Sequence, residues 1–224
     1  LPRIKPNEIT IKNYQKYLST FNYISTRETK LQQTLNEILP IPVEHVLDPS
    51  MLISRAEYEI MAYYPLDIPK GSYILCYFMP NNKKEEQKVR AYAACHSLHI
   101  VSMTMFSYSY TLNNAIIYAS AGPREYLGLI SNAAVVMTSS FHCTIFSILF
   151  NKELFVFENR RSGKSADISL RYKEQLTAYG MGHRLITEED DVTGNHLQPI
   201  DYKKVNEIFS QKLKRSQGFL NQFC

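Results

Sequence analysis

Tryptophan is absent from this sequence of 224 residues, and cysteine is scarce. The four cysteines form no C-x-x-C pair and show no spacing typical of metal ligands: Cys76, Cys95, Cys143 and Cys224. This argues against a disulfide framework and against a structural zinc site. We interpret them as reduced thiols in or beside apolar segments, and therefore expect a cytoplasmic protein without a metal.

Long hydrophobic runs and a dominant charge are also lacking. No window approaches the roughly 18 continuous apolar residues of a membrane span, and the first residues, LPRIKPNEITIKNYQ, lack the apolar core of a signal peptide. The formal net charge is only +4 and the basic residues are spread along the chain. We therefore expect a soluble protein that does not bind nucleic acid, while an anionic small molecule remains open as a ligand. The abrupt start suggests that an N-terminal portion is missing.

The hydrophobic pattern predicts alternating helices and strands. Short continuous apolar runs, typical of strands covered on both faces, occur at residues 73–78, 99–105, 133–138 and 154–157. Helical patterns separate them, at 84–98 and 124–132. Others follow at 168–180, where Gly180 is expected to end the helix, and from 200 onward. This rhythm predicts an α/β fold with a parallel sheet flanked by helices. We read the charged stretch NNKKEEQKVR (81–90) as a solvent-exposed helix start rather than a phosphate site.

The segment TSSFHC (138–143) places small polar residues and one histidine between two apolar runs. In a parallel sheet, ligands bind where strands lead into helix N-termini. If Ser139 or Ser140 caps a helix beginning at Phe141, His142 lies in the first helical turn, where free N–H groups favour an anion. The alternative is that Ser140 is simply a good cap and His142 packs in a polar notch at the edge of the core.

A basic segment follows the next predicted strand. FENRRSGKSADISLR (157–171) supplies Arg160, Arg161, Lys164 and Arg171 on the same edge of the sheet. A glycine- and serine-containing basic loop there suits the enclosure of an anionic donor, and we expect residues 158–167 to be poorly ordered without ligand. The alternative is an ordinary exposed basic loop.

Several stretches of this sequence resemble motifs of a known protein family. The stretch from GPREYLGLISNAAVVMTSSFHCTIFS to LTAYGMGHRLI (122–186) resembles the C-terminal half of bacterial polysaccharide pyruvyl transferases, and YISTRE (23–28) and HVLDPSMLI (45–53) resemble upstream motifs of that family. The chain departs from the family pattern at Cys143, where glycine is usual. That side chain either narrows the donor site or faces the core.

The resemblance implies a Rossmann-like sheet that forms the C-terminal lobe of a two-lobed fold similar to that of GT-B glycosyltransferases. On this interpretation residues 1–48 are a remnant of the N-terminal lobe, residues 49–200 form the donor-binding lobe, and residues 201–224 form a terminal helix. Most of an N-terminal lobe, and with it the acceptor side, is then expected to lie outside this sequence.

The resemblance also implies an activity: transfer of pyruvate from phosphoenolpyruvate, with no cofactor, onto a sugar of a cell-surface or capsular polysaccharide as a ketal. His142 would then be the proton donor or a hydrogen-bonding partner of the phosphoenolpyruvate, and Glu125 would face the cleft or merely stabilise its helix. The remaining positions would bind the donor: Arg171, Arg27, Ser139, Ser140, Thr144 and the basic loop. The acceptor would be a sugar or a lipid-linked oligosaccharide, which allows a peripheral membrane contact.

Two other functions remain compatible with the sequence. One is a glycosyltransferase of the same architecture that uses a nucleotide sugar as donor. The other is a non-catalytic lobe that binds an anion, because an acceptor site in another lobe would be absent. Binding of phosphoenolpyruvate compared with nucleotide sugars distinguishes these alternatives.

Overall fold

The computed structural model describes residues 7–77, 83–103, 115–118, 120–158, 166–193 and 198–223, with side chains except those of residue 83 and residues 166–171. The chain divides into two compact units. The first comprises Leu1–Leu52 with Asn206–Cys224, and the second comprises Ile53–Val205. The interpretation of residues 1–48 as the remnant of a further lobe stays a prediction.

The first unit is a small α/β assembly. It contains α1 (Glu8–Leu18), β1 (Ile24–Thr26), α2 (Thr29–Ile38), β2 (Val43–His45), the 3-10 turn η1 (Pro49–Met51) and the part of α8 (Tyr202–Leu220) that follows residue 205. The strands β1 and β2 pair in parallel. Their small core is built on Leu35, Leu39 and Val43. Asn7 begins α1, because its side-chain oxygen accepts a hydrogen bond from the Thr10 amide at 2.8 Å.

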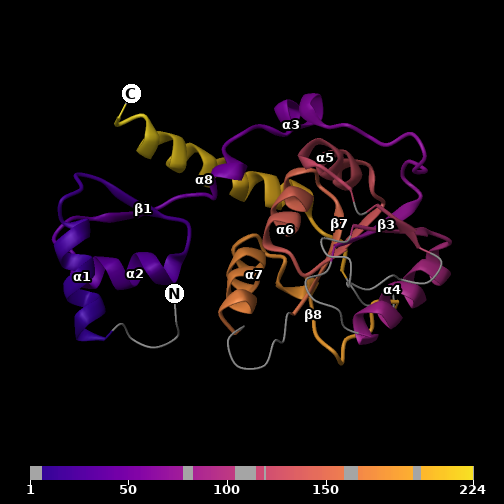
Figure 1. Cartoon of the computed structure of the whole chain (residues 1–224), viewed down its shortest axis with the longest axis horizontal. Helices are drawn as coiled ribbons and strands as arrows, with labels where there is room; N and C mark the ends of the chain where they lie inside the picture. The colour runs from indigo at the N-terminus through magenta and orange to yellow at the C-terminus, as the bar shows by residue number, and fades with distance from the viewer. Residues whose placement is uncertain are drawn as a thin grey trace. The chain divides into compact units, whose positions relative to one another are not determined.

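The second unit contains a six-stranded parallel sheet (Figure 1). Its strands are β3 (Tyr73–Tyr77), β4 (His99–Ser102), β5 (Ile116–Ile117), β6 (Val135–Thr138), β7 (Glu153–Phe157) and β8 (Leu185–Ile186). The spatial order is β5-β4-β3-β6-β7-β8, and each neighbouring pair is parallel. The predicted parallel sheet is thus confirmed. The order is that of a Rossmann fold, and it reverses direction between β3 and β6.

Helices cover both faces of this sheet. The helices are α3 (Arg55–Met61), α4 (Lys83–His96), α5 (Pro123–Asn132), α6 (Phe141–Leu149) and α7 (Ala166–Ala178), with a 3-10 turn at Gly182–Arg184. Val89 and Tyr92 of α4 pack in one core with Ile74 and Cys76 of β3. The next strand residue, Tyr77, points to the opposite face, where its ring lies 5.6 Å from that of Tyr126 in α5.

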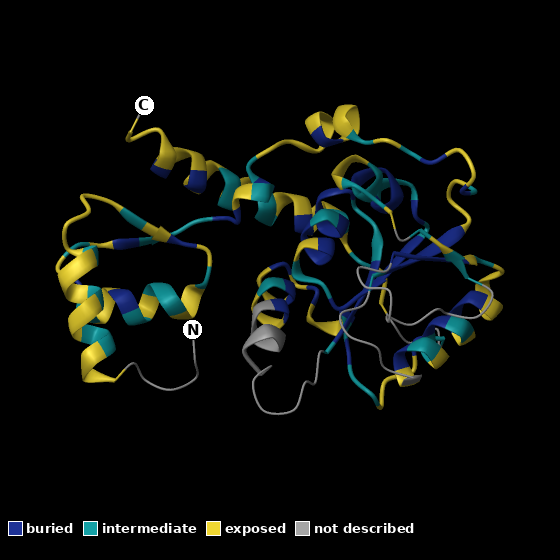
Figure 2. Cartoon of the chain, in the orientation of Figure 1, coloured by how far each residue is buried: buried dark blue, intermediate teal, exposed yellow. Residues whose placement is uncertain are grey.

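The strands that were predicted from continuous apolar runs are buried, as Figure 2 shows for the centre of the sheet. In β6 every residue is buried, and in β7 only Glu153 keeps partial exposure. The predicted stop of α7 at Gly180 is confirmed by its positive φ of 72° and by the hydrogen bond from the Met181 amide to the Leu176 carbonyl (2.7 Å). Among the helices and strands of the second unit, α3 and the two-residue strands β5 and β8 were not predicted.

The prediction of a solvent-exposed start for α4 was wrong at one position. Glu86 forms the expected i,i+4 ion pair with Arg90, at 2.5 Å. Glu85, however, is only 8% exposed, because it lies on the side of α4 that carries Val89 and Tyr92. Burial, and secondly the charge of Glu188, raises the pKa of Glu85 to about 8.

No helix within the described ranges is both long and apolar enough to cross a membrane.

Candidate functional site

The loop between β6 and α6 is attached to the end of β3. The Thr138 hydroxyl donates to the carbonyl oxygen of Tyr77 at 2.6 Å, and the Ser139 amide donates to the same oxygen at 3.2 Å. The Thr138 hydroxyl also accepts a hydrogen bond from the Ser140 amide at 3.0 Å. The loop therefore lies at the point where the strand order reverses, which is where ligands bind in open parallel sheets.

Ser140 is the N-cap of α6, as predicted. Its backbone is extended, and its Oγ accepts a hydrogen bond from the Cys143 amide at 3.4 Å. Its carbonyl oxygen accepts hydrogen bonds from both the amide and the hydroxyl of Thr144, each at 3.0 Å. These bonds satisfy one first-turn amide and fix the direction in which the helix leaves the sheet.

His142 is the second residue of α6 and its side chain is exposed. The imidazole packs edge-on against the ring of Phe141, with 5.5 Å between ring centroids. It therefore does not lie in the core, and it stands at the helix terminus where the helix dipole favours negative charge.

Cys143, which stands where the family usually has glycine, faces the core and not the donor site. The residue is fully buried, and burial raises the pKa of its thiol to about 11 despite hydrogen bonding with Thr138, Tyr126 and Ser147. Burial, and secondly the charge of Cys143, also raises the pKa of the Cys76 thiol. Cys143 therefore does not narrow an exposed donor site.

The first turn of α5 lies against the start of α6. Burial, and secondly Cys143, raises the pKa of the Tyr126 hydroxyl, which is also hydrogen-bonded with Ser140. The Tyr126 ring lies 5.8 Å from that of Phe146 in α6. Tyr126 was not singled out in the sequence, because a tyrosine in a helical pattern looks like any core residue. In the structure it connects two helix N-termini.

Glu125 precedes Tyr126 and is half-buried. Its carboxylate folds back over the N-cap of α5, since a β-carbon at Gly122 would lie 2.9 Å from Glu125 Oε2. A carboxylate in this place stabilises the helix dipole. It also lies on the same side of the sheet as the α6 N-terminus, so a structural role and a role at the site are compatible.

A tyrosine of α7 fixes the loop from the other side. The Tyr172 hydroxyl donates to the carbonyl oxygen of Ser139. Arg171 is the preceding residue of α7, so its backbone lies next to this contact, although its side chain is outside the described residues. Arg160, Arg161 and Lys164 lie outside the described residues, as does the part of the loop expected to be poorly ordered that runs from 159 to 165.

The other predicted binding residues are placed differently. Thr144 is fully buried with its hydroxyl bonded to the Ser140 carbonyl, and Ser139 is only 2% exposed. Arg27 belongs to the first unit, where it forms an ion pair with Asp48. Burial alone would raise the pKa of Asp48, but hydrogen bonds from Ser50 and the contact with Arg27 bring it below its usual value. Donor contacts for these residues stay predictions.

The described side chains include no group of three or more His, Cys, Asp or Glu arranged to hold a metal ion.

A model of the family described as polysaccharide pyruvyl transferase matches residues 4–161. The match covers most of the N-terminal segment of the first unit, and it covers the strand before His142 and the helix that carries it. The chain belongs to this family. The family match starts earlier and ends earlier than the stretch of motifs found in the sequence, which runs from about residue 23 to residue 186. A search of curated proteins found no match to the chain.

Among solved structures, the chain is similar to the glycotransferase of kitacinnamycin, at 14% identity over 68% of this chain and 41% of that one, with a TM-score of 0.43. It is also similar to a UDP-N-acetylglucosamine 2-epimerase from Rickettsia bellii, at 12% identity over 95% of this chain and 62% of that one, with a TM-score of 0.44. A third similar structure is a ugt transferase from Siraitia grosvenorii in complex with UDP, at 11% identity over 95% of this chain and 63% of that one, with a TM-score of 0.45. The chain thus spans less than two thirds of each of these proteins. With TM-scores below 0.5, these similarities support no conclusion about function.

Proposed function

We propose that this pyruvyl transferase chain binds phosphoenolpyruvate at the N-terminus of α6 and takes part in its transfer to a sugar. In this reaction C3 of the enol gains a proton, two sugar hydroxyl oxygens form bonds to C2, and the bond from C2 to the phosphate oxygen breaks. The products are a cyclic ketal and inorganic phosphate. The observation that carries the proposal is an exposed His142 on a capped helix N-terminus, at the reversal point of a parallel sheet, in a member of this family.

The helix terminus supplies what the donor requires. Phosphoenolpyruvate carries a carboxylate and a phosphate, and the first-turn amides of a helix donate hydrogen bonds to such groups. The bond from Thr138 to Tyr77 and the bond from Tyr172 to the Ser139 carbonyl hold the start of the loop, so that the amides are oriented before the donor arrives. Arg171 is proposed as a further anion ligand because a guanidinium binds carboxylate or phosphate with paired hydrogen bonds. Arg27, Arg160, Arg161 and Lys164 are proposed in the same role.

His142 has two chemically different roles open to it. An imidazolium near the enol would protonate C3, whereas an imidazole N–H would hold the carboxylate or the phosphate. Its exposure means that the ring turns toward a ligand without breaking core packing. Glu125 is proposed to accept the proton of an attacking sugar hydroxyl, because it is a carboxylate on the neighbouring helix start. A cytoplasmic location and a lipid-linked acceptor belong to the same proposal.

Calorimetric titration with phosphoenolpyruvate, with UDP-glucose and with inorganic phosphate tests the donor. We expect saturable binding of phosphoenolpyruvate that is weakened in Ser140→Pro, which disturbs the cap, and unchanged in Ser54→Ala, which removes the cap of α3. Tighter binding of UDP-glucose would favour the glycosyltransferase alternative, which the Rossmann strand order also allows. Binding of phosphate and phosphoenolpyruvate with equal affinity, and no phosphate release with any sugar, would indicate a non-catalytic anion-binding lobe.

A further inference from the structure

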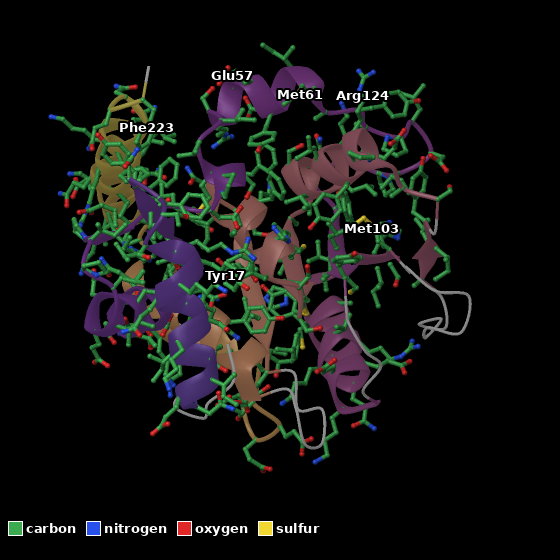
Figure 3. All side chains as sticks on the ribbon, turned by 60° about the vertical axis from the view of Figure 1, so that its left-hand side comes forward. Tyr17, Glu57, Met61, Met103, Arg124 and Phe223 are labelled. Atoms are coloured by element: carbon green, nitrogen blue, oxygen red, sulfur yellow. The ribbon has the colours of Figure 1, made fainter. Side chains whose placement is uncertain are left out.

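The loop that follows β8 passes over the first turns of α4. It runs from Thr187 to Thr193, and we call it the strap. Figure 1 shows it as an orange loop beside α4, and in Figure 3 side chains project from it at the bottom of the picture. Its sequence, TEEDDVT, places four acidic residues in a row. The strap was not singled out in the sequence.

Two turns give the strap its shape. Asp190 Oδ2 accepts hydrogen bonds from the amide and the hydroxyl of Thr187, at 2.6 and 2.7 Å. Asp191 Oδ1 accepts hydrogen bonds from the amide and the hydroxyl of Thr193, at 2.8 and 2.7 Å. All four bonds lie within the strap, so they are kept whether or not the strap touches α4.

Few contacts attach the strap to α4. Lys84 Nζ forms an ion pair with Glu188 at 2.5 Å, and Lys88 Nζ donates to the carbonyl oxygen of Asp190. Val192 is only 2% exposed and packs in the apolar core under α4. An open cavity of about 400 Å³ remains between the two elements. Because an ion pair at the surface contributes little free energy, the strap is held mainly by one valine.

Glu85 lies where the strap meets α4. It follows Lys84 in the chain and precedes Val89, which shares a core with Val192, by one helical turn. Glu85 is only 8% exposed, and within the described part of the chain its Oε2 is buried without a hydrogen-bond partner. A neutral carboxylic acid is tolerated in such a place at far lower cost than a carboxylate. The closed strap therefore favours the protonated form of Glu85.

The charge of the strap acts in the same direction. Burial, and secondly the negative charge of Glu188, raises the pKa of Glu85 to about 8. The other charged or titratable groups of the strap, of α4 near Glu85 and of the sheet core under it are Glu189, Asp190, Asp191, Lys84, Glu86, Lys88, Tyr92 and Cys76. Both lysines are already engaged with the strap, and Glu86 with Arg90.

We propose that the strap is a pH-sensitive cover, which closes on α4 while Glu85 is protonated and lifts when Glu85 ionises. Loss of the proton leaves a buried carboxylate beside Glu188, and lifting the strap gives that carboxylate water and separates it from Glu188. The inference concerns the α4 side of the sheet and does not depend on the identity of the donor.

The sign of the pH dependence follows from the two states. Glu85 binds its proton more tightly under the closed strap than in water, so the closed form loses ground as the pH rises from about 4.5 toward 8. Below about pH 4, protonation of Glu188 would remove its ion pair with Lys84. The strap should therefore be closed most firmly at mildly acidic pH and lift as the pH approaches 8.

The reactivity of a thiol placed at Val192 tests this inference. In a Cys224→Ser background, Val192→Cys puts a side chain of similar size where the closed strap buries it. Cys95 is exposed in the same chain, so dividing the two labelling rates removes the pH dependence of thiolate formation. We expect this ratio to rise between pH 6 and pH 8, by up to about tenfold for each pH unit, because one proton is released on lifting.

Two carboxylates of the same helix provide the comparison. Glu85→Gln should make the ratio independent of pH, because the amide does not ionise. Glu86→Gln is the matched control, since Glu86 pairs with Arg90 on α4, and it should leave the rise unchanged. Labelling of the buried Cys76 and Cys143 in the same samples reports unfolding of the whole unit and should stay slow.

Two results would overturn the inference. One is the same rise of the ratio in Glu85→Gln as in the unchanged background. The other is modification of Cys76 and Cys143 at the rate of the introduced thiol, because the unit would then unfold as a whole. If Val192→Cys does not fold, amide exchange of residues 187–193 relative to residues 135–138 is measured in the chain without it. An exchange ratio that is equal at pH 6 and pH 8 would then contradict a lifting strap.

Discussion

Gly128 of α5 lies so close to the carbonyl of Tyr63 that a β-carbon would stand 2.0 Å from its oxygen and 2.5 Å from its carbon. This contact involves backbone on one side, so no side chain can turn away to relieve it. It makes one helical glycine essential to the position of the segment that carries Tyr63 and Asp67.

Gly128→Ala should therefore destabilise the protein. In an exposed helix, replacement of glycine by alanine stabilises by about 1 kcal/mol. At Gly128 the steric conflict should reverse the sign and cost about 1 to 3 kcal/mol. Gly218→Ala is the matched control, because Gly218 lies within α8 and its added β-carbon would meet nothing within 4 Å. Urea unfolding of both variants measures the difference, and equal midpoints would show that the close approach is relieved without cost.

Removal of the N-cap side chain of α6 should lower the free energy of unfolding, because one hydrogen bond is lost. Ser140→Ala removes the oxygen that accepts from the Cys143 amide, with an expected loss of about 1 kcal/mol. Ser140→Gly should lose only a few tenths of that, because glycine leaves the amide open to water. If both variants unfold at the same urea concentration as the unchanged chain, the cap contributes nothing.

His142 should matter for activity and little for stability. Because the ring is exposed, His142→Ala should change the free energy of unfolding by about 1 kcal/mol or less. If the imidazole is the acid, kcat in the active enzyme should fall about a hundredfold to ten-thousandfold with donor affinity nearly kept. If it holds the anion, donor affinity should fall as well.

His142→Gln separates these two roles. Glutamine restores a hydrogen bond but transfers no proton, so it should recover donor binding in either case and turnover only if His142 holds the anion. Phosphate release and donor titration provide the two measurements. Near-normal pyruvyl transfer by His142→Ala would support the alternative that His142 only packs in a polar notch at the helix start.

The thiols should divide sharply in reactivity. Cys95 is exposed, whereas Cys76 and Cys143 are fully buried with pKa values raised by burial, that of Cys143 to about 11. In a Cys224→Ser background, a thiol-disulfide reagent should therefore modify one cysteine quickly at neutral pH, and two more only after unfolding. Cys95→Ala should abolish the fast reaction. A fast reaction that persists in that variant would mean that a core thiol is open to solvent.

Glu85 should give the protein a pH-dependent stability of a definite sign. Its pKa is about 8 in the folded chain and near 4.5 when exposed, so folding takes up a proton between these values. Stability is then greatest below about pH 4.5 for this group and is lost as the pH rises toward 8, by up to about 1.4 kcal/mol for each pH unit.

Glu85→Gln should flatten this dependence, because the amide is uncharged throughout. Glu189→Gln, on an exposed neighbour of Glu188, is the control and should leave the slope unchanged. Thermal unfolding from pH 5 to pH 8 gives the comparison. A slope that is identical in the unchanged chain and in Glu85→Gln would show that the carboxylate finds a partner or water when it ionises.

The sequence alone determined the elements whose hydrophobic signal is continuous. The runs at β3, β4, β6 and β7, the cap at Ser140 and the stop at Gly180 depend on interactions within a few residues, and each was confirmed. The family was also recognisable from local motifs around His142, and the family match confirmed it. The strands β5 and β8 escaped prediction because two residues carry no periodic signal.

Contacts between distant segments required the tertiary structure. The burial of Glu85 depends on which side of α4 faces the sheet, and the burial of Cys143 depends on how α6 packs beside Thr138 of β6 and Tyr126 of α5. Nothing in the sequence between α3 and β3 indicates that Tyr63 lies on α5, because the bond from its amide to the Arg124 carbonyl joins backbone groups more than sixty residues apart. The local sequence determines that a helix is capped at Ser140. Only the packing of α5 and α7 around the start of that helix decides which side chains lie beside it.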